Sequence, residues 1–200
     1  MSRMEKYTAS FLGRDCPGVV AAVSRLFGDM GCNIEAMSQT MLSGAFAAIF
    51  VVSAPEEKDG APKDAGVCGA DCLRLRLEEG LARAEVDLSV LVRPAIAEQW
   101  GAGLNCEPFV VTVDGPDRPG LIGGMSRVFG RHGVNIENLK AILGEGGEGR
   151  ALFVFEVMVP DSVDLGRLRR ELALEANNLN LRVSVQHRDI FEAVHRVSSF

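Results

Sequence analysis

The sequence predicts an α+β protein made of two similar domains, and three observations lead to this prediction. Residues 15–39 return as residues 117–141 without a gap, at an offset of 102 positions, and eleven of the 25 aligned residues are identical. Each copy lies among short runs of alternating apolar residues and helical patterns with apolar residues three or four positions apart. The chain has 200 residues, so each half keeps about 100 residues, which can bury a core.

The first elements of the first copy are a strand and a helix. The strand is predicted at residues 7–12, where apolar and polar residues alternate. The helix is expected to begin at Pro17, because the missing N–H of proline has no partner in the first turn of a helix. An apolar stripe follows, and Gly31 is expected to form a left-handed cap. The equivalent features of the second copy are residues 109–113, Pro119 and Gly133.

In both halves of the chain, the remaining residues predict the same order of elements. This order is a second strand, a third strand ended by proline, a second helix and a closing strand. These elements are expected at residues 32–42, 46–54, 72–83 and 86–92, and again at 134–143, 151–159, 165–177 and 181–185. The order βαββαβ with right-handed crossovers gives a four-stranded antiparallel sheet with both helices on one face, the ferredoxin-like arrangement. The predicted parts are domain 1 at 1–95, a linker at 96–107, domain 2 at 108–187 and an amphipathic tail, expected to be helical, at 188–200.

The third strand of the second domain is apolar on both faces. Phe153, Phe155 and Val157 are expected to face the helices, and Leu152, Val154 and Met158 lie on the opposite face. Water is not expected against such an apolar face, so something should cover it. The tail is one candidate, since Ile190, Phe191, Val194 and Val197 form a helical stripe. Two polar, glycine-rich segments, 55–70 and 144–149, are expected to be loops.

Composition excludes several classes of function. The net charge is -6, and no run of Lys or Arg is long enough to bind a phosphate backbone, so direct binding of nucleic acid is not expected. No apolar stretch is long enough to span a membrane, and the opening residues lack the features of a signal peptide. We therefore expect a cytoplasmic protein. Its five cysteines are scattered and odd in number, which predicts reduced thiols.

Three polar positions recur within the two copies and suggest a binding site. Each copy has an aspartate just before the expected helix, an asparagine at the start of the second strand, and a glutamate two residues later. The carboxylate of an amino acid could bind the N–H groups of the helix terminus, and its ammonium group the aspartate or the asparagine. A purely structural interpretation stays open, in which the aspartate caps the helix and the asparagine forms a turn. Gly18 and Gly120 could admit a ligand or let the helix pack.

Catalytic patterns are scarce. We find no nucleophile with a base, no paired carboxylates and no phosphate loop. Cys68 and Cys72 lack the spacing and the second ligand pair of a zinc site. Cys16 before a helix could be a reactive thiolate, but the second copy has Arg118 in its place. We expect no enzyme activity, no cofactor and no bound metal.

The repeated motif resembles the ACT domain, a small-molecule regulatory module. The shared features are a strand that ends in glycine, D-x-P-G, a short helix, and G-x-N-I at the next strand, and the whole chain resembles this pattern twice. DRPGL with GVNIE is the more standard copy, and the first copy has Cys16 where arginine is usual. The tandem arrangement, with SGAFAAIFVVSAPEE in the first copy, is similar to the glycine cleavage transcriptional repressor family. The closing QHRDIFEAVHR resembles the end of small stand-alone ACT proteins.

This resemblance implies an amino-acid sensor whose ligand lies at a seam between two ACT domains. The matching positions are Asp15, Gly18, Asn33, Asp117, Gly120 and Asn135. The leading hypothesis is a homodimeric regulator that binds glycine, serine or a similar amino acid and acts on a protein target such as a transcription factor. One alternative is an adaptor or oligomerisation module that has lost its ligand. Another is the detached regulatory part of a formyl-folate hydrolase or a serine-pathway enzyme.

Overall fold

A computed structural model describes residues 4–55, 69–96, 100–143 and 149–196. The chain divides into two compact units, Met1–Ala97 and Glu98–Phe200. Each unit contains its own cluster of buried apolar side chains.

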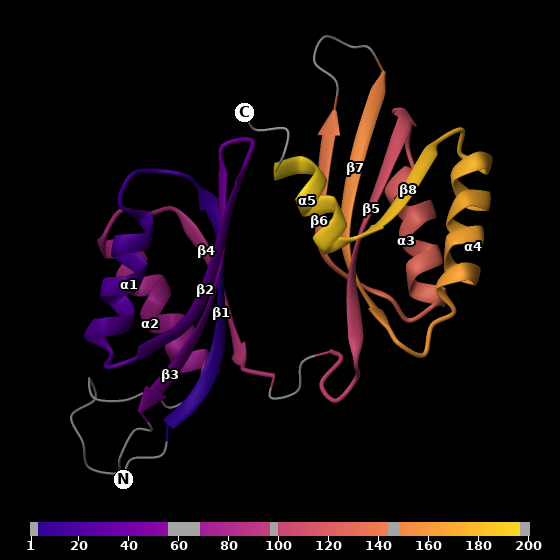
Figure 1. The fold of residues 1–200 in the computed structure, drawn as a ribbon. Coiled ribbons are helices and arrows are strands. Elements are labelled where there is room, and N and C mark those ends of the chain that lie inside the picture. Colours follow the sequence, from indigo (N-terminus) through magenta and orange to yellow (C-terminus); the bar gives the residue numbers. More distant parts are fainter. Residues whose placement is uncertain (1–3, 56–68, 97–99, 144–148, 197–200) are drawn as a thin grey trace. The chain divides into compact units, whose positions relative to one another are not determined.

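The first unit has the predicted order βαββαβ. Its elements are β1 (Met4–Arg14), α1 (Val19–Asp29), β2 (Asn33–Leu42), β3 (Ala45–Pro55), α2 (Ala70–Arg83) and β4 (Leu88–Pro94). The strands form an antiparallel sheet in the order β2-β3-β1-β4, with α1 and α2 on one face (Figure 1). The ferredoxin-like prediction is confirmed.

The second unit repeats this topology and adds a helix. Its elements are β5 (Cys106–Pro116), α3 (Leu121–Arg131), β6 (Asn135–Leu143), β7 (Arg150–Pro160), α4 (Leu165–Asn178), β8 (Arg182–His187) and α5 (Arg188–Arg196). The sheet order is β6-β7-β5-β8. Strand β5 begins at Cys106, so the last residues of the expected linker belong to this strand. Most of the two expected loops, 55–70 and 144–149, lies outside the described residues.

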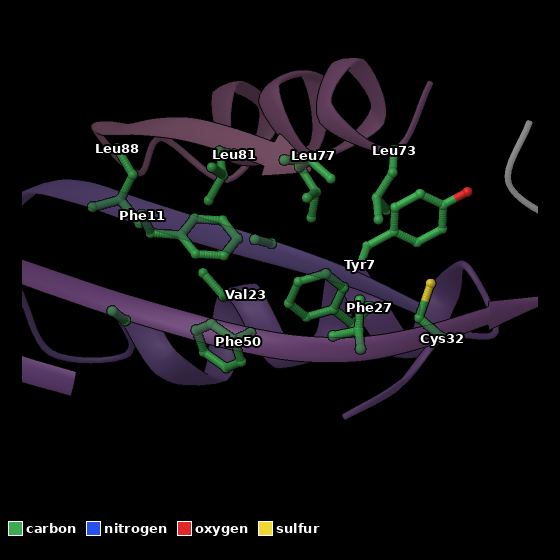
Figure 2. Close-up of a cluster of buried hydrophobic side chains, with 14 of the residues drawn as sticks. Tyr7, Phe11, Val23, Phe27, Cys32, Phe50, Leu73, Leu77, Leu81 and Leu88 are labelled. Carbon is green, nitrogen blue, oxygen red and sulfur yellow. The ribbon is translucent and has the colours of Figure 1, made fainter. Parts of the chain in front are cut away.

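The core of the first unit lies between the sheet and its two helices (Figure 2). Phe27 of α1 packs against Phe11 of β1 and Phe50 of β3, with ring centroids 6.0 and 5.5 Å away. In the second unit the strand β7 alternates as predicted, and its core-facing aromatic and aliphatic side chains are buried. These side chains are Phe153, Phe155 and Val157.

Both first helices end at the predicted glycine caps. Gly31 and Gly133 have φ values of +69° and +66°. In the first copy the N–H of Cys32 donates to the Phe27 carbonyl and the N–H of Gly31 donates to the Gly28 carbonyl. This pair of hydrogen bonds is the Schellman motif, which turns the chain from the helix into the next strand.

The tail helix α5 lies on the sheet face opposite α3 and α4 (Figure 1). A guanidinium nitrogen of Arg188 lies 2.9 Å from a Glu137 carboxylate oxygen on β6 and 3.9 Å from Glu156 on β7. On this face Val110 of β5 is only 3% exposed. Residues 188–196 of the expected tail form this helix, and residues 197–200 lie outside the described residues. Ile190 and Val194 of the expected apolar stripe are 58% and 56% exposed.

Candidate functional site

The segment between the first strand and the first helix is a tight turn in each copy. Pro17 and Gly18 occupy its centre, and the Val19 N–H donates to the Cys16 carbonyl at 3.3 Å. Gly18 has φ +94° and ψ -3°, which are the values of the third position of a type II turn. The expectation that the helix begins at Pro17 was wrong, because the proline sets the turn and the helix begins at Val19. Gly120 repeats the geometry with φ +93° and ψ -4°.

Glycine is required in these turns because of the backbone conformation, and not because the helix packs closely against it. A Cβ atom added to Gly18 or Gly120 would meet no atom within 4 Å. The positive φ is a conformation that side chains with a Cβ rarely adopt. Each glycine therefore allows the turn to form, and the space that a side chain would occupy at this position is open.

We expect Gly120→Ala to lower the free energy of unfolding by about 1–2 kcal/mol, because alanine is strained at this positive φ. Denaturant unfolding measures the change. Gly123→Ala is the matched control: this glycine lies on α3 and also faces open space. Alanine favours a helix by up to about 1 kcal/mol over glycine, so the control should be neutral or stabilising. A Gly120→Ala protein as stable as the Gly123→Ala protein would contradict this account of the turn.

The aspartates before the two helices do not cap them. The N-cap residues are Gly18 and Gly120, and no side chain accepts a hydrogen bond there. The backbone N–H of Asp15 donates to the Gly44 carbonyl at 3.2 Å, which ties the turn to the β2–β3 hairpin. The capping interpretation was therefore wrong. In the first copy the N–H of Val19 is already bound by the Cys16 carbonyl. The other N–H groups in the first turn of each helix have no intrahelical partner and stay available to an anion.

A pocket of about 270 Å³ opens beside the turn of the second unit. Its lining residues are Asp117, Arg118, Gly120, Leu121, Ile122, Gly123, Ala141 and Phe153. The first six come from the turn and the start of α3, and Ala141 and Phe153 are paired on β6 and β7. This volume lies just below the usual range of about 300–1,000 Å³ for ligand pockets, so only a small metabolite would fit.

The asparagines lie at the other end of each sheet. On β3, Ala45 pairs with Arg14 next to the turn, whereas Ser53, eight residues further along, pairs with Asn33. A strand rises by about 3.3 Å per residue, so roughly 26 Å separate the turn from the asparagine. Asn135, which pairs with Met158, is equally remote from the turn of the second unit. A hollow formed by the aspartate and the asparagine of the same repeat was therefore a wrong expectation.

Arg118 is a pocket residue that was absent from the predicted site. It follows Asp117 directly, so the pocket lining contains both a cationic and an anionic side chain. The sequence did contain a signal, since arginine at this position marks the standard copy of the motif. The first unit has Cys16 instead and lacks this positive charge.

A larger hollow of about 680 Å³ lies where α3 ends against α4. Its central carboxylate is Glu171, which lies 3.0 Å from Arg167 Nε and 3.2 Å from His132 Nε2. Hydrogen bonds from these two partners hold the pKa of Glu171 below its usual range. Since Arg131, His132 and Arg167 all lie within 4 Å of the Glu171 carboxylate, this hollow is a weaker candidate than the pocket beside Asp117.

Catalytic and metal chemistry gain no support from the described residues. Burial raises the pKa of the Cys32 thiol to about 11, so this thiol stays protonated and unreactive at neutral pH. Among the described side chains, no three His, Cys, Asp or Glu residues are grouped closely enough to hold a metal ion. No helix in the same part of the chain is long and apolar enough to cross a membrane.

The fold defines a class of protein: two tandem α+β domains of βαββαβ order, the second of which has a small pocket beside the turn that precedes α3. Models of the ACT domain match residues 8–62 and 109–173, which together are more than half of the chain. The chain therefore belongs to the ACT domain family, whose members are regulatory ligand-binding domains.

Similar sequences correspond to less than half of the chain. A UPF0237 protein of Methanopyrus kandleri is 41% identical over 92 residues, which are 44% of this chain and 96% of the relative. A UPF0237 protein of Pyrobaculum aerophilum is 35% identical over 88 residues, again 44% of this chain and 96% of the relative.

Two solved structures share the tandem fold over 92% of this chain. One is an unknown protein from Galdieria sulphuraria, with a TM-score of 0.70, 18% identity and 99% of its own chain covered. The other is named as a candidate glycine cleavage system transcriptional repressor, with a TM-score of 0.61, 20% identity and 98% of its chain covered. At these identities the similarity shows the fold alone.

Proposed function

We propose that this chain is a non-enzymatic regulatory protein that binds a small amino acid, such as glycine or serine, and acts through protein contacts. The observation that carries the proposal is the pocket beside the turn of the second unit. Asp117 can accept the ligand's ammonium group, and the free N–H groups of α3 together with Arg118 can bind its carboxylate. Opposite charges placed side by side match a zwitterion and disfavour ligands with one sign of charge.

The two turns are expected to differ in affinity. The backbone of the turn at Asp15 and Gly18 matches that at Asp117 and Gly120. The first turn lacks the guanidinium group, because Cys16 replaces Arg118. We therefore propose one stronger site per chain, in the second unit, and a weaker site in the first.

In this proposal, the asparagines contact the ligand only where two ACT domains meet. Because Asn33 and Asn135 lie far from the turn of their own unit, each can reach a ligand only from a neighbouring ACT domain of the assembly. A ligand that touches two domains binds their paired arrangement better than the separated one. This difference in affinity is what biases a two-state equilibrium and makes binding regulatory.

The downstream part of the proposal is a protein target in amino-acid metabolism, with a transcription factor as the leading candidate. The tandem fold shared with the candidate glycine cleavage repressor supports this part. The acidic net charge of -6 favours a protein target over direct binding of DNA.

Calorimetric titration of the full chain with the common amino acids, glycine and serine first, tests the proposal. We expect saturable binding of at least one of them, with one strong site per chain. Asn135→Ala should weaken binding if the ligand lies at a seam and leave it unchanged if the pocket binds alone. No heat from any amino acid would reject the sensor and favour a ligand-free adaptor.

A further inference from the structure

The pocket beside the turn of the second unit has two chemically different parts. Its polar part consists of Asp117, Arg118 and the N–H groups at the start of α3, which the proposed function assigns to the charged groups of an amino acid. The other described residues that line the pocket have no polar group in their side chains. These residues, which we call the apolar wall, are Leu121, Ile122, Gly123, Ala141 and Phe153.

The apolar wall joins the first turn of α3 to the sheet. Leu121 and Phe153 are buried, whereas Ile122 is 39% exposed and Ala141 is exposed on the edge strand β6. A Cβ atom added to Gly123 would meet no atom within 4 Å, so the helix leaves space at this position. A ligand whose charged groups are held at the turn has only this wall left for its side chain.

The backbone near the apolar wall offers few partners to a hydroxyl group of a ligand. The Gly120 carbonyl already accepts the N–H of Gly124 at 2.9 Å, and Ala141 and Phe153 form a paired position of the β6–β7 ladder. The N–H groups at the start of α3 are the ones that the proposal assigns to the ligand's carboxylate. A hydroxyl group that moves from water to this wall loses hydrogen bonds without replacing them, which costs free energy.

The first repeat shows that the fold does not require these wall residues. At the offset of 102 positions that relates the two copies, Ala141 corresponds to Gln39. Gln39 is exposed and pairs with Ala48, as Ala141 pairs with Phe153. An amide and a methyl group therefore take the places of a methyl group and a phenyl ring. The wholly apolar wall is particular to the second unit.

We propose that the pocket of the second unit selects amino acids with a small apolar side chain, from alanine to valine, over serine and threonine, an inference that rests on the proposed function and narrows its ligand class. A volume of about 270 Å³ equals that of about nine water molecules at roughly 30 Å³ each, which is enough for valine. An apolar side chain placed there removes its own surface and that of Ile122 from water.

Valine and threonine provide the sharpest test, because their shapes are nearly the same and a hydroxyl group in threonine replaces a methyl group of valine. The experiment is calorimetric titration of the full chain with valine and threonine, and with alanine and serine as a second pair. We expect valine to bind about tenfold to a hundredfold more tightly than threonine, the usual discrimination of a hydrophobic pocket against an added hydroxyl group. Alanine should likewise bind more tightly than serine.

Ala141→Ser assigns this preference to the apolar wall. The substitution adds a hydroxyl group at an exposed position of β6, so the fold should persist and the ratio of valine to threonine affinity should fall severalfold. Ile142→Ser is the matched control. Ile142 is the next residue of β6, is 55% exposed, and lies on the opposite face of the strand. The control should keep the wild-type ratio.

The outcomes separate this inference from the proposed function. Equal affinities for valine and threonine, or binding of glycine alone, would overturn the selection of an apolar side chain and leave the amino-acid sensor standing. A ratio that is unchanged in Ala141→Ser, or that falls equally in Ile142→Ser, would also overturn it. No heat from any amino acid would reject the sensor itself, and the selectivity with it.

Discussion

Phe27→Ala is expected to destabilise the first unit by about 3–5 kcal/mol, the usual cost of removing a buried aromatic ring. Phe27 is fully buried and contacts the rings of Phe11 and Phe50 (Figure 2), so no neighbour can fill the space without losing contacts of its own. Denaturant unfolding combined with amide hydrogen exchange measures the loss. This cost is a large fraction of the stability of a small domain.

Amide hydrogen exchange also shows in which unit the Phe27→Ala protein loses stability. The buried cluster around Phe27 contains only residues of the first unit, so protection from exchange should fall there and persist in the second. Phe129→Ala, at the equivalent position of α3, should give the reverse pattern. Leu75→Ala is the control, since Leu75 is half exposed on α2 and should cost little. Equal loss of protection in both units would show that the two cores unfold together.

Asp117→Asn is expected to weaken amino-acid binding about tenfold to a hundredfold. The substitution keeps the shape of the side chain and removes the charge that we assign to the ligand's ammonium group. A hydrogen bond to a charged group contributes about 1.5–3 kcal/mol, and about 1.4 kcal/mol corresponds to a factor of ten in Kd. Isothermal titration calorimetry with the amino acid identified for the wild-type protein measures the change.

Asp15→Asn is the matched control for this prediction. Asp15 occupies the same position in the first turn, beside Cys16 instead of an arginine. The stronger site should therefore keep its affinity in Asp15→Asn. Neither aspartate caps its helix, so both variants should unfold at the wild-type denaturant midpoint. If Asp15→Asn and Asp117→Asn weaken binding equally, the assignment of the site to the second unit is wrong.

Most of the fold could be predicted from sequence because its signals are local. The period of the apolar residues identified the strands and helices, and Gly31 and Gly133 marked where the helices end. The start of the first helix was misplaced because Pro17 suits two local structures, the first turn of a helix and the second position of a type II turn. The positive φ of Gly18 decides between them, and sequence does not show it.

The candidate site was predicted only in part. Asp117 and Gly120 do line a pocket, because the turn that holds them is a local structure that the D-x-P-G motif encodes. Asn135 was grouped with them because it lies within the same short motif along the chain. Helix α3 lies between these residues and runs along the length of the sheet. Asp117 and Asn135 are therefore close in sequence but lie at opposite ends of the sheet.

The sequence by itself determined the duplication, the βαββαβ order of each unit and the glycine-dependent turns, because each of these depends on backbone preferences and apolar periodicity within a few residues. Only the tertiary structure decided which pocket wall faces Asp117, where the asparagines lie, and which sheet face remains open. Those features depend on strand register and on the docking of α5 through Arg188, and both arise from pairing between residues that are distant along the chain.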